Sequence, residues 1–132
     1  MFEQHQLEMD LPVVYDERDM TPMDMVKEFV KTSGQVPNPT MSAQLIKEEY
    51  NELLDEWHKA NRGNELKELA DLVYVVYGYA NARGWDLDMA LLRVHDNNMG
   101  RMHQEDGTIL RRDDGKVIKN KSYPKVQLGD LV

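Results

Sequence analysis

Apolar residues recur at spacings of three and four through most of the chain, which is the pattern of amphipathic helices. The segment "TPMDMVKEFVKTSG" opens with Thr21 as a helix N-cap and Pro22 at the first helical position, and Gly34 stops it. Later stretches repeat the pattern with short polar connections between them. The pattern predicts four helices, at about 22–33, 42–60, 65–82 and 87–102.

The predicted core follows the same periodicity. On the third helix the core-facing set is Leu69, Leu72, Val73, Val76, Tyr77 and Ala80. On the fourth it is Met89, Leu92, Met99 and Met102. The connection "NRGN" at 61–64 is short enough to join antiparallel neighbours, so these stripes predict a four-helix, bundle-like all-α fold.

The character of the chain changes after residue 103. "TILRRDDGKVIKN" places Asp114 and Gly115 between two short apolar-containing runs, which predicts a two-residue hairpin turn. "SYPKVQLGDLV" is expected to be an extended tail. At the other end, the first twenty residues contain Pro12 and no sustained period, so we expect them to be extended or irregular.

Composition narrows the class of protein. With 132 residues, 41% hydrophobic and 30% charged, the chain is expected to be one domain over 1–132, with a core at about 21–103 and a basic tail at 104–132. There is no Cys, which excludes disulfides and thiolate metal sites and fits the cytoplasm. The longest nearly unbroken apolar stretch, 72–80, is too short to span a membrane, and a signal peptide is not expected at the start.

Charge is unevenly distributed along the chain. The net charge of −8 opposes binding to nucleic-acid polymers and to anionic membranes. Residues 101–132, however, carry seven Lys and Arg against five Asp and Glu. An acidic body with a basic tail is compatible with simple solubility, and also with a protein that binds metal and phosphate together.

Two pairs of carboxylates stand beside the predicted core stripes. Glu49 and Glu52 share one face of the second helix, and Glu68 and Asp71 share one face of the third. If these helices pack antiparallel, the two pairs meet, and a hard cation such as Mg²⁺ would relieve their repulsion. The competing interpretation is that these are solvated surface residues. Asp71 weakens that interpretation, because it stands among apolar residues in "LADLVYVV".

These residues carry a family resemblance. "KEEYNELLDEW" followed by "ELKELADLVYVVYGYA" resembles the E-x-x-E…E-x-x-D signature of the all-α, MazG-like nucleoside triphosphate pyrophosphohydrolases. "VHDNNMGRM" is similar to their fourth-helix segment, and "DGTILRRDDGKVIKNKSY" resembles the tail of the phosphoribosyl-ATP pyrophosphohydrolase-like branch. Upstream, "VKEFVKTSGQVPNPT" is similar to that branch's first helix and loop. The likeness covers about residues 22–125.

The resemblance implies roles for individual residues. It makes four carboxylates the ligands of Mg²⁺, for which Mn²⁺ can substitute: Glu49, Glu52, Glu68 and Asp71. Glu48 matches a neighbouring Glu of the motif, and either Glu49 or Glu52 is the candidate general base. Six residues are implied to contact the substrate: Asn98, Arg101, Lys116, Lys119, Lys121 and Tyr123. Arg101 stands where the family usually has Lys, and "KNKSY" lacks the usual Gly-Pro after the tail lysine.

The implied activity is Mg²⁺-dependent hydrolysis of nucleoside triphosphates, with a lean towards deoxynucleotides, between the α- and β-phosphates. Two alternatives stay open. One is a phosphoribosyl-ATP pyrophosphohydrolase, which is less favoured because the tail follows the relatives that act on nucleoside triphosphates. The other is a non-catalytic helical oligomer that binds a nucleotide. The resemblance also implies a homodimer or homotetramer, in which the tail of one subunit closes the site of another. Met25, Phe29 and the tyrosines are the expected contact surface.

Overall fold

The computed structural model describes residues 19–132. Four helices account for most of this part of the chain: α2 (Pro22–Ser33), α3 (Pro39–Glu56), α4 (Arg62–Arg83) and α5 (Leu87–Gly100). A two-stranded antiparallel sheet, β1 (Leu110–Arg111) and β2 (Val117–Ile118), and a single 3-10 turn, η2 (Gly129–Leu131), follow. The predicted mostly helical fold with a C-terminal hairpin is confirmed. The expectation for the first twenty residues lies almost entirely outside the described range.

Local capping chemistry sets the ends of the helices. Thr21 and Asp24 form a reciprocal capping box at the start of α2, and Gly34 ends that helix at φ 72°. Helix α3 begins three residues earlier than predicted, because Asn38 caps it and Pro39 occupies the first helical position. It also ends before the predicted 60, at Glu56.

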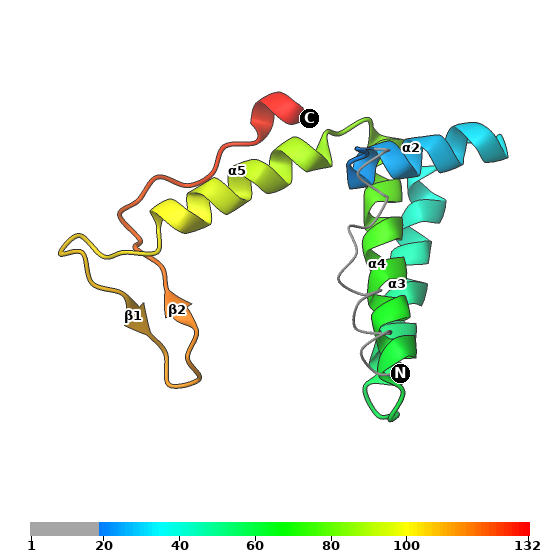
Figure 1. The fold of residues 1–132 in the computed structure, drawn as a ribbon. Coiled ribbons are helices and arrows are strands. Elements are labelled where there is room, and N and C mark those ends of the chain that lie inside the picture. The colour runs from blue at the N-terminus through cyan, green and yellow to red at the C-terminus, as the bar shows by residue number, and fades with distance from the viewer. Residues whose placement is uncertain (1–18) are drawn as a thin grey trace, which may run out of the picture.

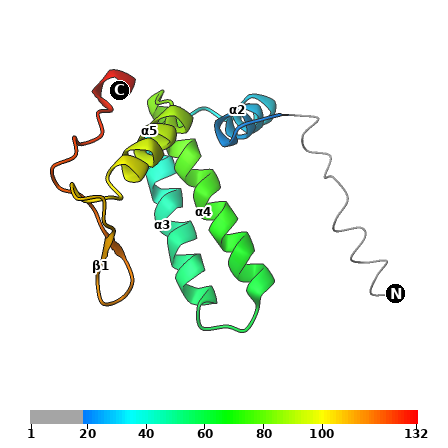
Figure 2. The same ribbon diagram turned by 60° about the vertical axis from the view of Figure 1, so that its left-hand side comes forward.

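Helices α3 and α4 form an antiparallel hairpin (Figure 2), which is the most extensive contact among the described elements. Helix α2 crosses the upper part of α4, and the buried core lies at this crossing. It consists of Met23 and Val26 from α2 and Tyr77 and Ala80 from α4, with Val30, Trp85 and Leu87 packed against them. The core is therefore small and sits at one end of the hairpin.

Helix α5 does not pack along the α3–α4 hairpin. Figures 1 and 2 both show it leaving the end of α4 at a steep angle and carrying the β-hairpin away from the other helices. Gly84 ends α4 at φ 77°, and Trp85 donates its backbone N–H to the carbonyl of Ala80. The four predicted helices are present, but within one chain they do not close a bundle. The predicted core residues Met89, Leu92 and Met99 are instead 39–51% exposed.

The C-terminal tail folds back along α5 (Figure 1). Arg93 makes a bidentate ion pair with Asp130, with N–O distances of 2.6 and 2.8 Å, and Asn97 donates to the carbonyl of Pro124 at 2.8 Å. The ring of Tyr123 lies so close to Gly100 that an added Cβ would be 2.3 Å from it. Helix α5, the β-hairpin and the tail, residues 87–132, are called the arm below.

The β-hairpin differs from its prediction in one detail. Leu110 pairs with Ile118 and Arg111 with Val117, and the backbone N–H of Arg112 donates to the carbonyl of Lys116 at 2.7 Å. Three residues, 113–115, therefore form the connection instead of two. Gly115 adopts φ 91°, which is the left-handed last position of a three-residue hairpin loop.

Candidate metal centre on the helical hairpin

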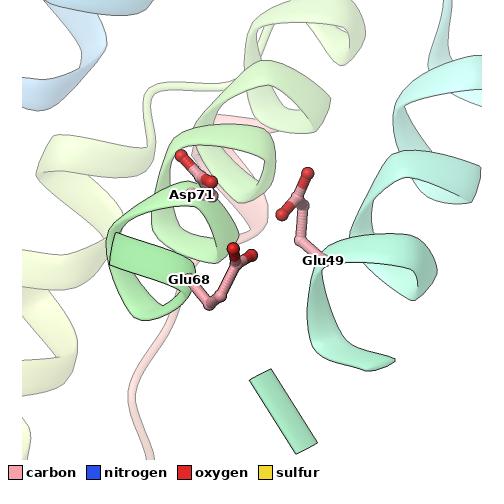
Figure 3. Close-up of side chains that lie close together, drawn as sticks. All are labelled: Glu49, Glu68 and Asp71. Atoms are coloured by element: carbon pink, nitrogen blue, oxygen red, sulfur yellow. The ribbon is translucent and has the colours of Figure 1, made fainter. Parts of the chain in front are cut away.

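The α3–α4 hairpin brings three carboxylates to one point. Glu49 projects from α3 towards Glu68 and Asp71 on α4 (Figure 3), and one oxygen from each lies within 4.8 Å of the others. Glu68 and Asp71 are three residues apart and so share one face of α4. All three side chains are half-buried. The helical spacing predicted that the two acidic pairs face each other, and Glu49, Glu68 and Asp71 do so.

Glu52 lies beside this group and not within it. It is exposed on α3, and its carboxyl group contributes to the raised pKa of Glu49. The structure thus separates the four predicted ligands into a cluster of three, Glu49, Glu68 and Asp71, and a flanking Glu52.

The electrostatics of the cluster favour a protonated Glu49. Burial raises the pKa of Glu49 to about 7, and the interaction of its carboxyl group with that of Glu52 is the second cause. The negative charges of Glu52, Asp71 and Glu68 raise it further. A carboxyl group that titrates near neutrality can exchange its proton for a metal ion under ordinary conditions.

Lys67 is a member of this site that the sequence reasoning did not single out. Its ammonium nitrogen lies 2.8 Å from Asp71 Oδ2 and 3.5 Å from Glu68 Oε1, and these contacts with Asp71 and then Glu68 raise its pKa. The side chain is 67% exposed, so it can swing away. The i, i+4 spacing of Lys67 and Asp71 was the available signal. Lys67 supplies positive charge to carboxylates that would otherwise repel one another.

A divalent cation fits the donor set. Glu49 Oε2 and Glu68 Oε2 are buried and have no hydrogen-bond partner, although buried carboxylate oxygens are normally satisfied. Hard cations such as Mg²⁺ prefer oxygen ligands of this kind and complete their shell with water and phosphate. The observations therefore agree with a hard-cation site at Glu49, Glu68 and Asp71.

Three other acidic residues of α3 have different surroundings. Glu48 and Asp55 are exposed. Glu56 is only 12% exposed at its side chain, where one oxygen meets Lys59 at 3.3 Å and the other is buried without a partner. The acidic row on α3 thus continues from Glu49 to Glu56, while Glu48 and Asp55 face solvent.

An apolar cavity of about 110 Å³ lies next to the carboxylates along the hairpin. Leu45, one turn before Glu49 on α3, and Val75, one turn after Asp71 on α4, both line it. Further walls come from α2, its following loop, the first turn of α3 and the later part of α4: Val26, Phe29, Val30, Gln35, Pro37, Asn38, Ser42, Tyr74, Gly78 and Asn81. The cavity thus begins one turn from the carboxylate cluster with apolar side chains and has the side-chain amides of Asn38 and Asn81 further along the helices.

The residues predicted to contact substrate phosphates lie elsewhere in the chain. Asn98 is exposed on α5, and Arg101 caps the end of that helix with its Nε buried and unpartnered. Lys116 follows the hairpin loop, and Lys119 and Lys121 line a hollow at the base of the hairpin. Tyr123 packs against Gly100. Figures 1 and 2 place this whole arm apart from the middle of the α3–α4 hairpin, so a single chain does not bring the two predicted sets together.

A helical hairpin with three converging carboxylates is an arrangement with which a helical protein could hold a cation. The comparison with family models makes this more specific: residues 17–98 match the phosphoribosyl-ATP pyrophosphohydrolase family, and the chain belongs to that family, within the MazG-like superfamily. The membership implies a pyrophosphohydrolase, a hydrolase that acts on acid anhydrides. No individual curated protein matched the chain significantly. None of the helices described in 19–132 has the length and apolar character to cross a membrane.

Proposed function

We propose that this protein uses Mg²⁺ to hydrolyse the anhydride bond between the α- and β-phosphates of a nucleotide triphosphate, releasing pyrophosphate. The observation that carries the proposal is the convergence of Glu49, Glu68 and Asp71 in a chain of a pyrophosphohydrolase family. A triphosphate is highly anionic, so an acidic site binds it only through a cation.

Each carboxylate has a role in this proposal. Glu49, Glu68 and Asp71 would hold Mg²⁺, which when bound supplies positive charge to the phosphate oxygens and lowers the pKa of a coordinated water. Glu52 is exposed at the edge of the cluster, and its carboxyl group interacts with that of Glu49. It is therefore the better placed of the two candidate bases to accept a proton from the attacking water.

Two substrate classes fit the reaction, and different parts of the chain favour each. The family's description favours phosphoribosyl-ATP, which would yield phosphoribosyl-AMP and pyrophosphate. The tail motif "DGTILRRDDGKVIKNKSY" lies outside the matched residues 17–98 and favours nucleoside triphosphates, deoxynucleotides among them. Both substrates carry the same α–β anhydride.

The apolar cavity indicates how the substrate would lie. With its phosphates at the carboxylates, the base of the substrate would point along the hairpin towards Leu45 and Val75. Asn38 and Asn81 line the same cavity and can donate and accept hydrogen bonds at a base edge. Base preference is therefore expected to depend on these two amides.

A product analysis tests the proposal. The purified protein is incubated with Mg²⁺ and either phosphoribosyl-ATP, the ribonucleoside triphosphates or the deoxynucleoside triphosphates, and the products are separated by chromatography. Pyrophosphate together with the monophosphate supports the proposal, and the substrate with the highest kcat/KM identifies the class. Diphosphate plus orthophosphate would contradict it.

The same experiment separates the catalytic proposal from a nucleotide-binding oligomer without activity. Binding of a triphosphate with no turnover at any Mg²⁺ concentration would favour the non-catalytic alternative. Asp71→Asn serves as the matched variant, because it removes a cluster charge at nearly constant volume. Full activity in Asp71→Asn would show that the assigned site is wrong.

A further inference from the structure

The apolar cavity beside the carboxylates is small for a nucleotide base. Its volume is about 110 Å³. For comparison, a dry apolar cavity of about 150 Å³ is enough to bind one benzene ring. A pyrimidine is a single six-membered ring, whereas a purine has a second ring fused to one of that size. The cavity therefore has space for one ring of a base, and the second ring of a purine would lie outside it.

Two aromatic rings and a glycine limit the space in this cavity. Phe29 on α2 and Tyr74 on α4 both line it, and their rings meet edge to face with centroids 6.0 Å apart. Gly78 lies one turn after Tyr74 on the same helix and also lines the cavity. An added Cβ at Gly78 would meet nothing within 4 Å, so this glycine leaves open space where another residue would place its side chain.

The polar groups of the cavity suit the edge of a pyrimidine. Ser42 lines the cavity and is the one buried polar residue in the part of the chain from 19 to 132. Its hydroxyl group can donate to cytosine N3 or accept from uracil N3–H. Asn38 Oδ1 accepts the backbone N–H of Met41 at 3.2 Å, so the amide N–H groups of Asn38 are left to donate. The carbonyl oxygen that every pyrimidine base carries at C2 can accept such a bond.

The same walls are poorly suited to phosphoribosyl-ATP. That substrate carries a second, phosphorylated ribose on N1 of its adenine, at the end of the base away from the triphosphate. Proteins hold such a phosphate with Arg or Lys side chains. The twelve residues of 19–132 that line the cavity include no Lys, Arg or His. The cavity therefore has neither the space nor the charge that a phosphoribosyl group requires.

We infer that the substrate is a pyrimidine nucleoside triphosphate, whose single ring fills this cavity while its phosphates lie at the carboxylates. The inference rests on the proposed hydrolase activity and narrows its substrate. Leu45 and Val75 line the cavity one turn from Glu49 and Asp71, roughly 5.4 Å along the helices. This separation leaves space for the sugar between the phosphates and the ring. A purine triphosphate would bind through its phosphates, with much of its base outside the cavity.

A panel of substrates tests the selectivity directly. Steady-state kinetics are measured at saturating Mg²⁺ with dCTP, dUTP, dATP, dGTP and phosphoribosyl-ATP. We expect kcat/KM for dCTP and dUTP to exceed that for dATP and dGTP by about tenfold or more, because a ring excluded from an apolar pocket loses at least as much contact as a methylene group. Phosphoribosyl-ATP is expected to be the poorest substrate. A purine nucleotide with an equal or higher kcat/KM would overturn the inference.

Filling the cavity should weaken pyrimidine binding. Gly78→Ala adds a methyl group in open space, so kcat/KM for dCTP and dUTP is expected to fall about tenfold, mainly through KM. Gly63→Ala is the matched control, because it makes the same change in the first turn of α4, where an added Cβ would have an ordinary contact with Asn61 Oδ1 at 3.5 Å. Wild-type kinetics in Gly78→Ala would show that the base binds elsewhere.

Widening the cavity should relax the selectivity. Phe29→Ala removes an aromatic wall, so the ratio of kcat/KM for dCTP to that for dATP is expected to fall several-fold. Phe29 is 51% exposed and outside the buried core, and thermal melts check that the variant remains folded. Met25→Ala, an exposed position on the same helix that does not line the cavity, is the control. An unchanged ratio in folded Phe29→Ala would contradict the assignment.

Binding measurements separate failure of this inference from failure of the proposed function. Calorimetry with α,β-imido analogues of dCTP and dATP, which cannot be cleaved at that bond, measures selectivity without turnover. If no triphosphate is hydrolysed, the proposed function fails, but tighter binding of the dCTP analogue would still support a pyrimidine site. If dATP is hydrolysed as well as dCTP and both analogues bind equally, the inference fails and the proposed function stands.

Discussion

At the scale of single residues, Glu68 provides the sharpest test of the cation site. Glu68→Gln removes one of three converging charges, so Mg²⁺ binding weakens and activity is expected to fall about a hundredfold or more. Steady-state kinetics over a range of Mg²⁺ concentrations measures the loss. Asp55→Asn, on the exposed side of α3, is the control and should keep wild-type activity.

The raised pKa of Glu49 predicts opposite effects of pH on metal binding and on the metal-free fold. The pKa is raised from 4.5 to about 7, so the metal-free protein loses stability as pH rises through this window. Mg²⁺ needs the deprotonated carboxylate, so its apparent affinity rises over the same range. Calorimetric titration with Mg²⁺ at pH 5.5, 7 and 8 checks this. In Glu49→Gln, both the Mg²⁺ affinity and the stability of the metal-free protein should vary less with pH.

Lys67 is expected to stabilise the fold when metal is absent. Lys67→Met removes the ammonium group beside Asp71 and Glu68, so the metal-free melting temperature should fall. Saturating Mg²⁺ would neutralise the same carboxylates, so the difference in melting temperature between Lys67→Met and the wild type should then become smaller. Thermal melts with EDTA and with Mg²⁺ make the comparison, and Lys31→Met on α2 is the control. An equal drop under both conditions would argue against this role.

At the scale of the elements, the packing of Tyr123 on Gly100 holds the tail against α5. Gly100→Ala would place a methyl group 2.3 Å from the ring. The clash involves the far end of a side chain, so we expect Tyr123 to move and residues 122–128 to loosen while α5 stays folded. Hydrogen exchange of these amides should rise. Gly78→Ala is the matched control, because a Cβ there meets nothing within 4 Å, and a helix interior gains about 0.5–1 kcal/mol from the change.

The sequence predicted the helices well because their signals are local. Thr21, Gly34 and Asp86 cap helices where their residue types indicate, and the apolar period locates the segments between them. The prediction began this helix three residues late, at 42, although Pro39 is well suited to a first helical turn.

Periodicity did not predict which apolar residues the chain itself would bury. Leu92 and Met99 have the spacing of core residues, yet they are about half exposed. A helical stripe shows that a face avoids water, but it does not show which surface covers it. The convergence of Glu49, Glu68 and Asp71 was predictable because a short connection leaves α3 and α4 one way to pack. The contact of Lys67 with them depends on a side-chain rotamer.

At the scale of the whole molecule, stability is expected to depend on protein concentration. The buried core of the described residues is small, whereas Leu69 and Val73 on α4 and Leu91, Leu92 and Met99 on α5 are about half exposed and would be buried only on association. The melting temperature should therefore rise with concentration for the wild type and stay constant for L91E/L92E. Differential scanning fluorimetry over a hundredfold concentration range measures this, with Val36→Glu expected to follow the wild type.

A small rotation at the connection between α4 and α5 would produce a large displacement at the far end of α5. Gly84 and Trp85 form the turn, and Trp85 is braced by the ring of Tyr79, with centroids 6.1 Å apart, and by the guanidinium of Arg83 at 5.0 Å. Helix α5 has 14 residues and is about 21 Å long, so a rotation of about 10° at the joint moves its far end by roughly 4 Å. Such a displacement exceeds the length of a hydrogen bond. The rigidity of the contacts among Tyr79, Arg83 and Trp85 would therefore determine how precisely Arg101 is positioned. None of these three residues belongs to the carboxylate cluster.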